Sequence, residues 1–147
     1  MARSWTIFHL KQNRIPTEDL ISVYSSIIRF SIEYAVSVYH HMLNGEQTER
    51  LERMQRKTFK TIYGHKVSYR SALERSGLRT LAERREEIVE TFTAKLAANG
   101  RFSEWFPLKP RCTYCLRKHQ EYEELRAGTD QLMKSPLYSM RKNLNKK

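Results

Sequence analysis

The chain has 147 residues, of which 39% are hydrophobic and 29% are charged, so it can build one core and one domain. It carries 27 lysines and arginines against 16 aspartates and glutamates, a net charge of +11. This balance favours a polyanionic partner, although a solvated basic surface without a specific partner fits it as well. The two cysteines, Cys112 and Cys115, exclude a disulfide framework, and no signal peptide is visible, so we expect an intracellular protein.

The first helix is predicted over Ala2–Gln12 and ends before Pro16, because the residue before a proline avoids the helical region. Thr17 is the predicted cap of a second, long helix that reaches residue 43, with Asn44-Gly45 as its stop signal. Apolar residues surround most of this helix, which predicts a central place in the domain. It also contains Arg29 and Glu33, which are spaced to pair on a helix and which a bilayer would resist, so we expect no membrane partner.

Three more helices follow at shorter intervals. The third is predicted over 46–63, ends at Gly64, and has an inner stripe of Leu51, Met54, Gln55, Thr58 and Ile62. The fourth, over 69–76, lies between a Ser68 cap and Gly77. The fifth begins at a capping box formed by Thr80 and Glu83 and ends at Asn99-Gly100, with a predicted core face of Leu81, Ile88, Phe92 and Leu96.

The C-terminal part differs in character. An aromatic segment over 102–108 precedes residues 109–147, which carry ten basic and four acidic residues. We expect this tail to be partly disordered, with a short helix near Gln120–Ala127. The predicted fold is therefore all-α: a small bundle of about five helices over 1–108 and an irregular basic tail over 109–147.

The sequence lacks the residue patterns that most classes of enzyme need for catalysis. Two-metal phosphoryl transfer needs clustered carboxylates, yet the only aspartates are Asp19 and Asp130, far apart in the chain. There is no phosphate-binding loop, dinucleotide-binding turn or nucleophile elbow. We therefore predict that the chain is not an enzyme, with no catalytic residue and no cofactor.

Metal binding has one weak candidate. Cys112, Cys115 and His119 offer three possible zinc ligands, but neither their spacing nor their number matches a standard zinc motif. His40 and His41 are adjacent and point to different sides of a helix, so they do not easily share a metal. We predict no metal site and interpret the two cysteines as ordinary thiols in the tail.

A stripe of cations on the third predicted helix is the candidate binding site. Arginines and lysines at three- and four-residue intervals can follow a phosphate backbone. The solvated outer face of an amphipathic helix gives the same pattern, and the spacing does not separate the two interpretations. We call these residues the basic stripe: Arg50, Arg53, Arg56, Lys57 and Lys60.

Many short motifs, in one order along nearly the whole chain, resemble the segment after the polymerase palm in jockey-like non-LTR (LINE-type) retrotransposon reverse transcriptases. The motifs are Leu10-Lys11 through Pro16, Asp19-Leu20 to Tyr24, Ile28-Arg29, Glu33-Tyr34-Ala35, Val38-Tyr39-His40, Leu51-Glu52, Gln55-Arg56-Lys57, Ile62-Tyr63-Gly64, Tyr69, Leu73, Gly77-Leu78, Thr80-Leu81, Arg84-Arg85, Phe92, Phe102, Trp105-Phe106-Pro107, Leu116-Arg117, Arg126 and Ser135-Pro136-Leu137. The sequence departs from the family at Phe30 and Ser37, where prolines are frequent, and at Tyr39, where tryptophan is common.

The resemblance implies a helical thumb and its C-terminal extension, which grip a template–primer duplex through its backbone. It also implies that the parent protein is an RNA-directed DNA polymerase of a transposable element, whose palm would be a partner of this segment. Because the endonuclease, fingers and palm are not in this chain, we expect it to derive from a degraded element copy or from a gene model drawn over one.

Two functions follow from these observations as expectations. The first is a noncatalytic thumb-like segment that binds an RNA–DNA hybrid or RNA without reading its sequence. The alternative is a helical protein–protein interaction module, domesticated or orphaned from its palm, because the apolar stretch Leu20–Leu43 would expose much of its surface when isolated.

Overall fold

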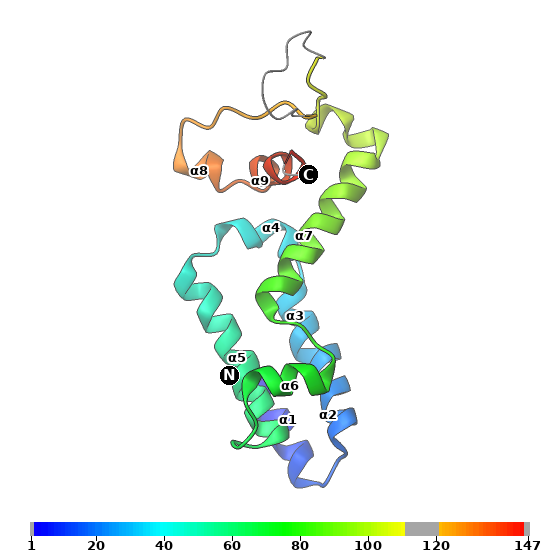
Figure 1. Ribbon diagram of the computed structural model, residues 1–147, viewed down its shortest axis with the longest axis vertical. Coiled ribbons are helices and arrows are strands. Elements are labelled where there is room, and N and C mark those ends of the chain that lie inside the picture. Colours follow the sequence, from blue (N-terminus) through cyan, green and yellow to red (C-terminus); the bar gives the residue numbers. More distant parts are fainter. Residues whose placement is uncertain (1, 111–120, 146–147) are drawn as a thin grey trace. The chain divides into compact units, whose positions relative to one another are not determined.

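The computed structural model describes residues 2–110 and 121–145, and the side chains among them from Trp5 onward (Figure 1). These residues form helices and no strand, with one isolated antiparallel bridge between Leu108 and Tyr122, so the all-α prediction is confirmed. Contacts divide the chain into unit 1 (1–36 and 43–85) and unit 2 (37–42 and 86–147). The division at Leu108 that composition and charge suggest stays a prediction.

Unit 1 begins with α1 (Ala2–Gln12), as predicted, and α2 (Thr17–Val23). A π-helical turn, η1 (Tyr24–Arg29), and α3 (Phe30–Glu33) continue α2. The predicted single helix to residue 43 is wrong beyond Glu33, because Tyr34 has ψ 129° and Ala35 has φ +56°. The predicted Thr17 cap is also wrong, since Pro16 occupies the N-cap position and no side chain bonds there.

The predicted stop signal Asn44-Gly45 instead starts a helix. The chain passes through α4 (Val36–Tyr39) and the 3-10 turn η2 (His40–Met42) before α5 (Gly45–Tyr63) begins. The Asn44 side chain accepts a hydrogen bond from the Gln47 backbone nitrogen at 2.8 Å, and the Gln47 side chain accepts one from Asn44 at 3.0 Å. Asparagine followed by glycine suits either helix end, and this reciprocal capping box decides in favour of a start.

The remaining boundaries of unit 1 follow the sequence closely. Gly64, with φ +91°, ends α5. Ser68 caps α6 (Tyr69–Ser76), and Gly77 ends it in the left-handed conformation that glycine adopts without strain. Thr80 and Glu83 form the predicted capping box at the start of α7 (Leu81–Ala98), with both bonds at 3.2 Å.

The core of unit 1 joins α1, α2, η1, α5 and α6 through Ile7, Leu20, Tyr24, Ile28, Phe59, Ile62 and Ala72. The rings of Tyr24 and Phe59 meet edge to face, with centroids 5.5 Å apart. On α5 the predicted inner residues Gln55, Thr58 and Ile62 are buried. Met54, which was predicted to be in the core, is exposed, and Phe59 is buried there instead.

Buried polar groups fix the rotation of α5 about its axis. The Tyr24 hydroxyl donates to Gln55 Oε1 at 3.0 Å, and Gln55 Nε2 donates to the Arg79 carbonyl at 3.2 Å. Glu52 accepts from the Tyr69 hydroxyl and, at 3.2 Å, from the Leu81 backbone nitrogen. Such bonds are costly to leave unmade in a core, so they hold one face of α5 inward and thereby turn the basic stripe outward.

Unit 2 contains η3 (Gly100–Trp105), α8 (Asp130–Met133) and α9 (Pro136–Leu144). The predicted helix Gln120–Ala127 is wrong over 121–127, where Tyr122 instead forms its bridge to Leu108. Asn145 holds this stretch: its Oδ1 accepts from the Tyr122 nitrogen at 3.0 Å, and its Nδ2 donates to the Tyr122 carbonyl at 2.9 Å. Helices α8 and α9 were not predicted from the sequence, although Thr129 and Ser135 before Pro136 are ordinary capping signals.

The predicted core face of α7 is partly wrong. Leu81 is buried as expected, but Phe92 is exposed, and the row that is buried consists of Leu81, Arg85, Val89 and Thr93. Two of these polar side chains bond to their own helix: Arg85 Nε donates to the Leu81 carbonyl at 3.1 Å, and the Thr93 hydroxyl donates to the Val89 carbonyl at 2.7 Å. A prediction of the buried face of α7 from hydropathy alone therefore selects the row of residues beside the one that is buried.

Candidate nucleic-acid interface

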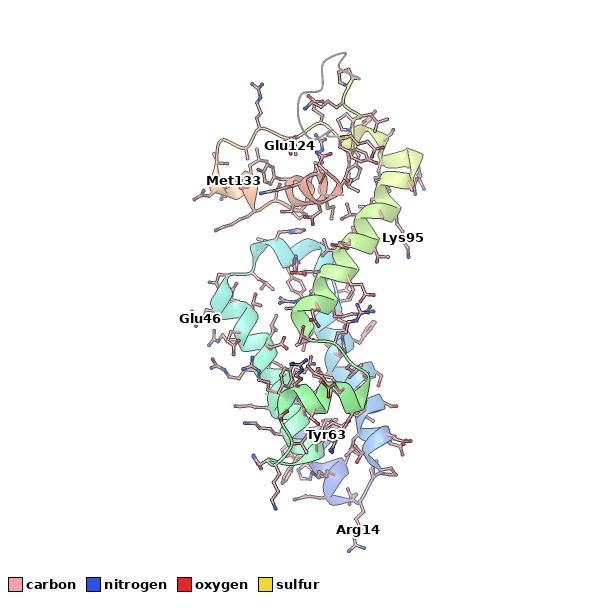
Figure 2. The ribbon with its side chains drawn as sticks, in the orientation of Figure 1. Arg14, Glu46, Tyr63, Lys95, Glu124 and Met133 are labelled. Atoms are coloured by element: carbon pink, nitrogen blue, oxygen red, sulfur yellow. The ribbon has the colours of Figure 1, made fainter. Side chains whose placement is uncertain are left out.

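The basic stripe lies on the outer face of α5, whose two ends are marked by Glu46 and Tyr63 in Figure 2. All five predicted side chains are exposed, and they alternate with the buried Glu52, Gln55, Thr58 and Phe59. The structure therefore brings the predicted residues together on one continuous face of a single helix of 19 residues.

Arg56 differs from the other four cations of the stripe. Its Nη1 donates to Glu49 Oε1 at 3.1 Å, and its guanidinium lies 5.3 Å from the centroid of the Tyr69 ring. Arg56 is therefore held by an acid and an aromatic ring of its own unit. Its charge is largely engaged within the fold.

The side chains of the other four members of the stripe make no hydrogen bond or ion pair with any residue that the structure describes. Arg50 and Arg53 lie toward the start of α5, and Lys57 and Lys60 lie toward its end. Because these side chains have no bonded partner in the described part of the chain, their charges are available to an external anion. We call these four residues the unpaired cations.

A further cation, Lys11, extends this charged surface. Its Nζ donates to the carbonyl oxygens of Thr61 and Ile62, at 2.5 and 3.0 Å, at the end of α5. A cation there is favoured by the helix dipole and by the otherwise unbonded carbonyls. Sequence reasoning missed Lys11 because nothing in the order of residues shows that α1 ends beside α5.

Three other arginines, in contrast, are held within the fold. Arg29 Nε donates to Glu33 Oε1 at 2.6 Å, which confirms the pairing predicted from their spacing, and Arg84 approaches the same carboxylate at 3.6 Å. In unit 2, Arg141 is buried and its Nε donates to the Trp105 carbonyl at 2.6 Å. These arginines join parts of the fold and are not available for binding.

Among the described residues no group of three histidine, cysteine, aspartate or glutamate side chains could hold a metal ion. The candidate ligands Cys112, Cys115 and His119 lie outside the described residues. His40 and His41 lie in η2 with their ring centroids 5.1 Å apart. Burial lowers the pKa of His41, and the nearby charge of His40 lowers it further.

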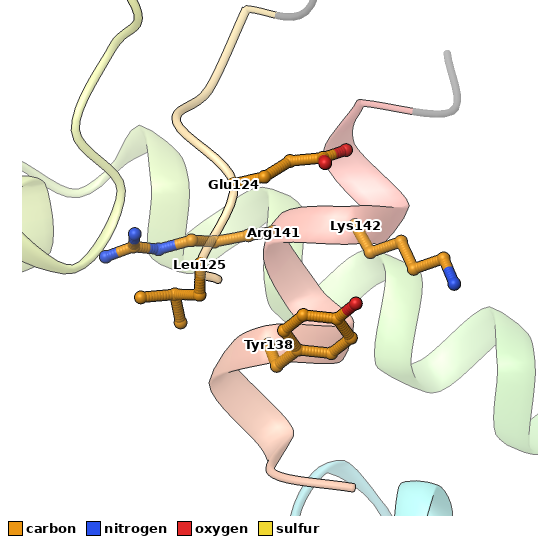
Figure 3. Close-up of a pocket in the computed structure, with 5 residues that line it drawn as sticks. All are labelled: Glu124, Leu125, Tyr138, Arg141 and Lys142. Atoms are coloured by element: carbon orange, nitrogen blue, oxygen red, sulfur yellow. The ribbon is translucent and has the colours of Figure 1, made fainter. Parts of the chain in front are cut away.

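Unit 2 has a small pocket of about 200 Å³ between the segment near Glu124 and α9 (Figure 3). Leu125, Tyr138 and Lys142 line it together with Glu124 and Arg141. The guanidinium of Arg141 is engaged with the carbonyls of Trp105 and Glu123. The pocket therefore offers mixed charge and a single lysine, which is a weaker anion site than the stripe.

No helix in the described part of the chain is both long and apolar enough to cross a membrane. No family model, curated protein or solved structure matches this chain. The resemblance to non-LTR reverse transcriptases is therefore an interpretation of sequence motifs, and the arrangement of α5 carries the functional argument.

Proposed function

We propose that this chain is a noncatalytic, thumb-like segment of a non-LTR retrotransposon reverse transcriptase that binds an RNA–DNA hybrid or RNA through its phosphate backbone. The observation that carries this proposal is the group of four unpaired cations on the outer face of α5. The order of motifs in the sequence supports the proposed family, and the unpaired cations support the proposed nucleic-acid ligand.

The geometry of a helix makes this face suitable for a polynucleotide. At about 1.5 Å per residue, the ten helical steps from Arg50 to Lys60 span about 15 Å. Duplex DNA carries one charge per roughly 1.7 Å of its axis, so a face of that length meets several phosphates. Side chains that touch only phosphates position the ligand without reading its bases, which is the sequence-independent binding proposed here.

A salt series on the whole chain tests the proposal. Four phosphate contacts predict that the logarithm of the association constant for an RNA–DNA hybrid falls with the logarithm of salt concentration, with a slope of about −3 to −4. Fluorescence anisotropy with a labelled hybrid measures this slope. Absence of binding at low salt, or binding that salt does not weaken, contradicts the proposal.

The noncatalytic part has its own test. Only Asp19, in the first turn of α2, and Asp130, in the first turn of α8, are aspartates in this chain. We expect no primer extension with magnesium or manganese, because the clustered carboxylates that hold two metal ions are absent from the sequence. Extension that disappears when this chain is removed from the assay contradicts this expectation.

A second candidate function is a protein-interaction module, and one observation favours it. Ile27 in η1, Phe30 in α3 and Tyr34 directly after α3 follow one another at intervals of three and four residues, and all three are exposed, Phe30 by 65% and Tyr34 by 74%. Contiguous exposed apolar side chains mark interaction surfaces, and in a full-length parent the palm would be the expected partner.

Sedimentation velocity and a thermal unfolding curve test this second candidate. Self-association that is abolished by replacing Ile27, Phe30 and Tyr34 with glutamine supports an interaction module. A monomer with a sharp unfolding transition, whose behaviour those substitutions leave unchanged, counts against it.

A further inference from the structure

Helix α1 carries a second exposed surface, made of aromatic rings. Trp5 is 65% exposed and Phe8 is 49% exposed, and they lie three residues apart on the same side of the helix. The His9 ring touches both, with centroids 3.8 Å from Trp5 and 5.7 Å from Phe8. Single exposed apolar residues are common, but neighbouring exposed rings on one helix are typical of an interaction surface.

The rings lie on a helix that adjoins the helix of the unpaired cations. Helix α1 packs against α5 (Figure 1). Ile7 of α1 is fully buried, and Lys11 is bonded to the Thr61 and Ile62 carbonyls. Trp5, Phe8 and Lys11 form one row on α1 at intervals of three residues, and the Lys11 end of this row touches α5.

The point of contact lies next to the basic stripe. Thr61 follows Lys57 by four residues, so these two residues are neighbours on one side of α5. Lys11 therefore joins the end of this row to the last turn of α5, one turn after Lys57. Unit 1 thus presents exposed rings and unpaired charges on adjoining helices.

We propose that these adjoining helices of unit 1 bind single-stranded nucleic acid, with bases stacked on Trp5 and Phe8 and the backbone held by the unpaired cations. This inference rests on the proposed function and narrows its ligand. A duplex hides the faces of its bases, whereas a single strand exposes them to aromatic side chains. A second copy of the chain is a poor occupant, because its net charge of +11 repels the same cations.

The test compares a single strand with a duplex. The chain contains two tryptophans, Trp5 and Trp105, so the Trp105→Phe variant reports on Trp5 alone. An oligouridylate or oligodeoxythymidylate of about 15 nucleotides, a length typical of such sites, should quench the Trp5 fluorescence. An RNA–DNA hybrid should bind with little quenching, and the response to the two single strands distinguishes RNA from DNA as the preferred ligand.

The double substitution W5A/F8A should weaken binding to the single strands about tenfold or more and change binding to the hybrid less than twofold. The matched control is F92A, which removes an exposed phenylalanine of α7 and should alter neither affinity. The ring-preserving variant W5F/F8Y should restore most of the single-strand affinity.

The outcomes separate the two proposals. Salt-dependent binding that W5A/F8A leaves unchanged, or weakens equally for both ligands, overturns the stacking inference and keeps the basic interface. Absence of salt-dependent binding to either ligand overturns both. Trp5 fluorescence that stays unquenched in the single-strand complex also overturns the stacking inference. A dimer of the chain that W5A/F8A dissociates overturns it as well, because the rings would then bind a second copy.

Discussion

The outer face of α5 and the buried arginines of the same chain carry the same charge but differ in what surrounds them. Arg29 is buried and bonded to Glu33 at 2.6 Å, and Arg85 is 2% exposed with its Nε bonded to a carbonyl of its own helix. Arg53 and Lys57 are exposed and have no partner in the described part of the chain. Burial and partners, rather than spacing in the sequence, separate cations that build the fold from cations that can bind a ligand.

The same difference exists between the two faces of α5. On its inner face, Glu52 and Gln55 join α5 to Tyr24, Tyr69 and the segment before α7. On its outer face, the charges are solvated and cost the fold little when they are changed. We therefore expect substitutions on the inner face to change stability and substitutions on the outer face to change binding.

The largest effect is expected from Glu52→Leu. It leaves the Tyr69 hydroxyl and the Leu81 nitrogen without their acceptor inside the fold, which should cost about 3 kcal/mol in the free energy of unfolding. The control is Glu49→Leu on the same helix, whose half-exposed ion pair with Arg56 should change stability by about 0.5 kcal/mol or less. Urea unfolding measures both, and equal losses would remove the distinction between the two faces.

Alkaline pH sharpens the comparison further. Burial raises the pKa of Tyr24 and Tyr69, and for Tyr69 the hydrogen bond to Glu52 raises it further. In the unfolded chain a tyrosine loses its proton near pH 10, whereas these two keep theirs in the fold. The unfolded state therefore binds fewer protons above about pH 10, and the free energy of unfolding should fall as pH rises there.

Urea unfolding at a series of pH values from about 9 to 11 measures this loss around the ordinary tyrosine pKa. The Y24F/Y69F variant is the control, and its free energy of unfolding should fall less steeply over the same interval. Parallel curves for the two proteins would show that these hydroxyls do not couple stability to pH.

A smaller effect separates two members of the stripe. Arg53→Ala should weaken binding to an RNA–DNA hybrid about fivefold, because Arg53 is unpaired and a phosphate contact of this kind is worth about 1 kcal/mol. Arg56→Ala should weaken it less than twofold, since Glu49 and Tyr69 already hold that guanidinium. Anisotropy titrations at one salt concentration measure both losses of affinity. A larger loss for Arg56→Ala than for Arg53→Ala would contradict the prediction.

The smallest effect is expected in unit 2 at mildly acidic pH. Burial, followed by the charge of His40, lowers the pKa of His41 below its usual value near 6.5. The unfolded chain takes up the proton first as pH falls below about 6.5, so stability should decrease there. From pH 7 to pH 5 the midpoint of thermal unfolding should decrease more steeply for the natural chain than for His41→Gln. Identical curves would show that His41 does not couple stability to pH.

The sequence predicted local features well because short-range chemistry decides them. The Ser68 and Thr80 caps, the Gly64 and Gly77 ends and the Arg29–Glu33 pair each depend on residues within about one helical turn. The exposed stripe on α5 follows from the same periodicity.

Several features that the sequence did not predict depend on distant residues or on backbone conformation. The positive φ of Ala35 divides the predicted second helix, and no local signal announces it. The Asn145 bonds to Tyr122 join residues that lie 23 positions apart. Lys11 reaches the end of α5 only because α1 packs there, which places it in the candidate site.

The most direct test compares the salt dependence of two triple variants. R53A/K57A/K60A removes three unpaired cations from α5, and K95A/R101A/K134A removes three exposed cations of unit 2 with the same change in net charge. Binding to an RNA–DNA hybrid should show a salt slope about 2.7 smaller in magnitude for the first variant and an unchanged slope for the second. Equal slopes for the two variants would contradict the assignment of the interface to α5.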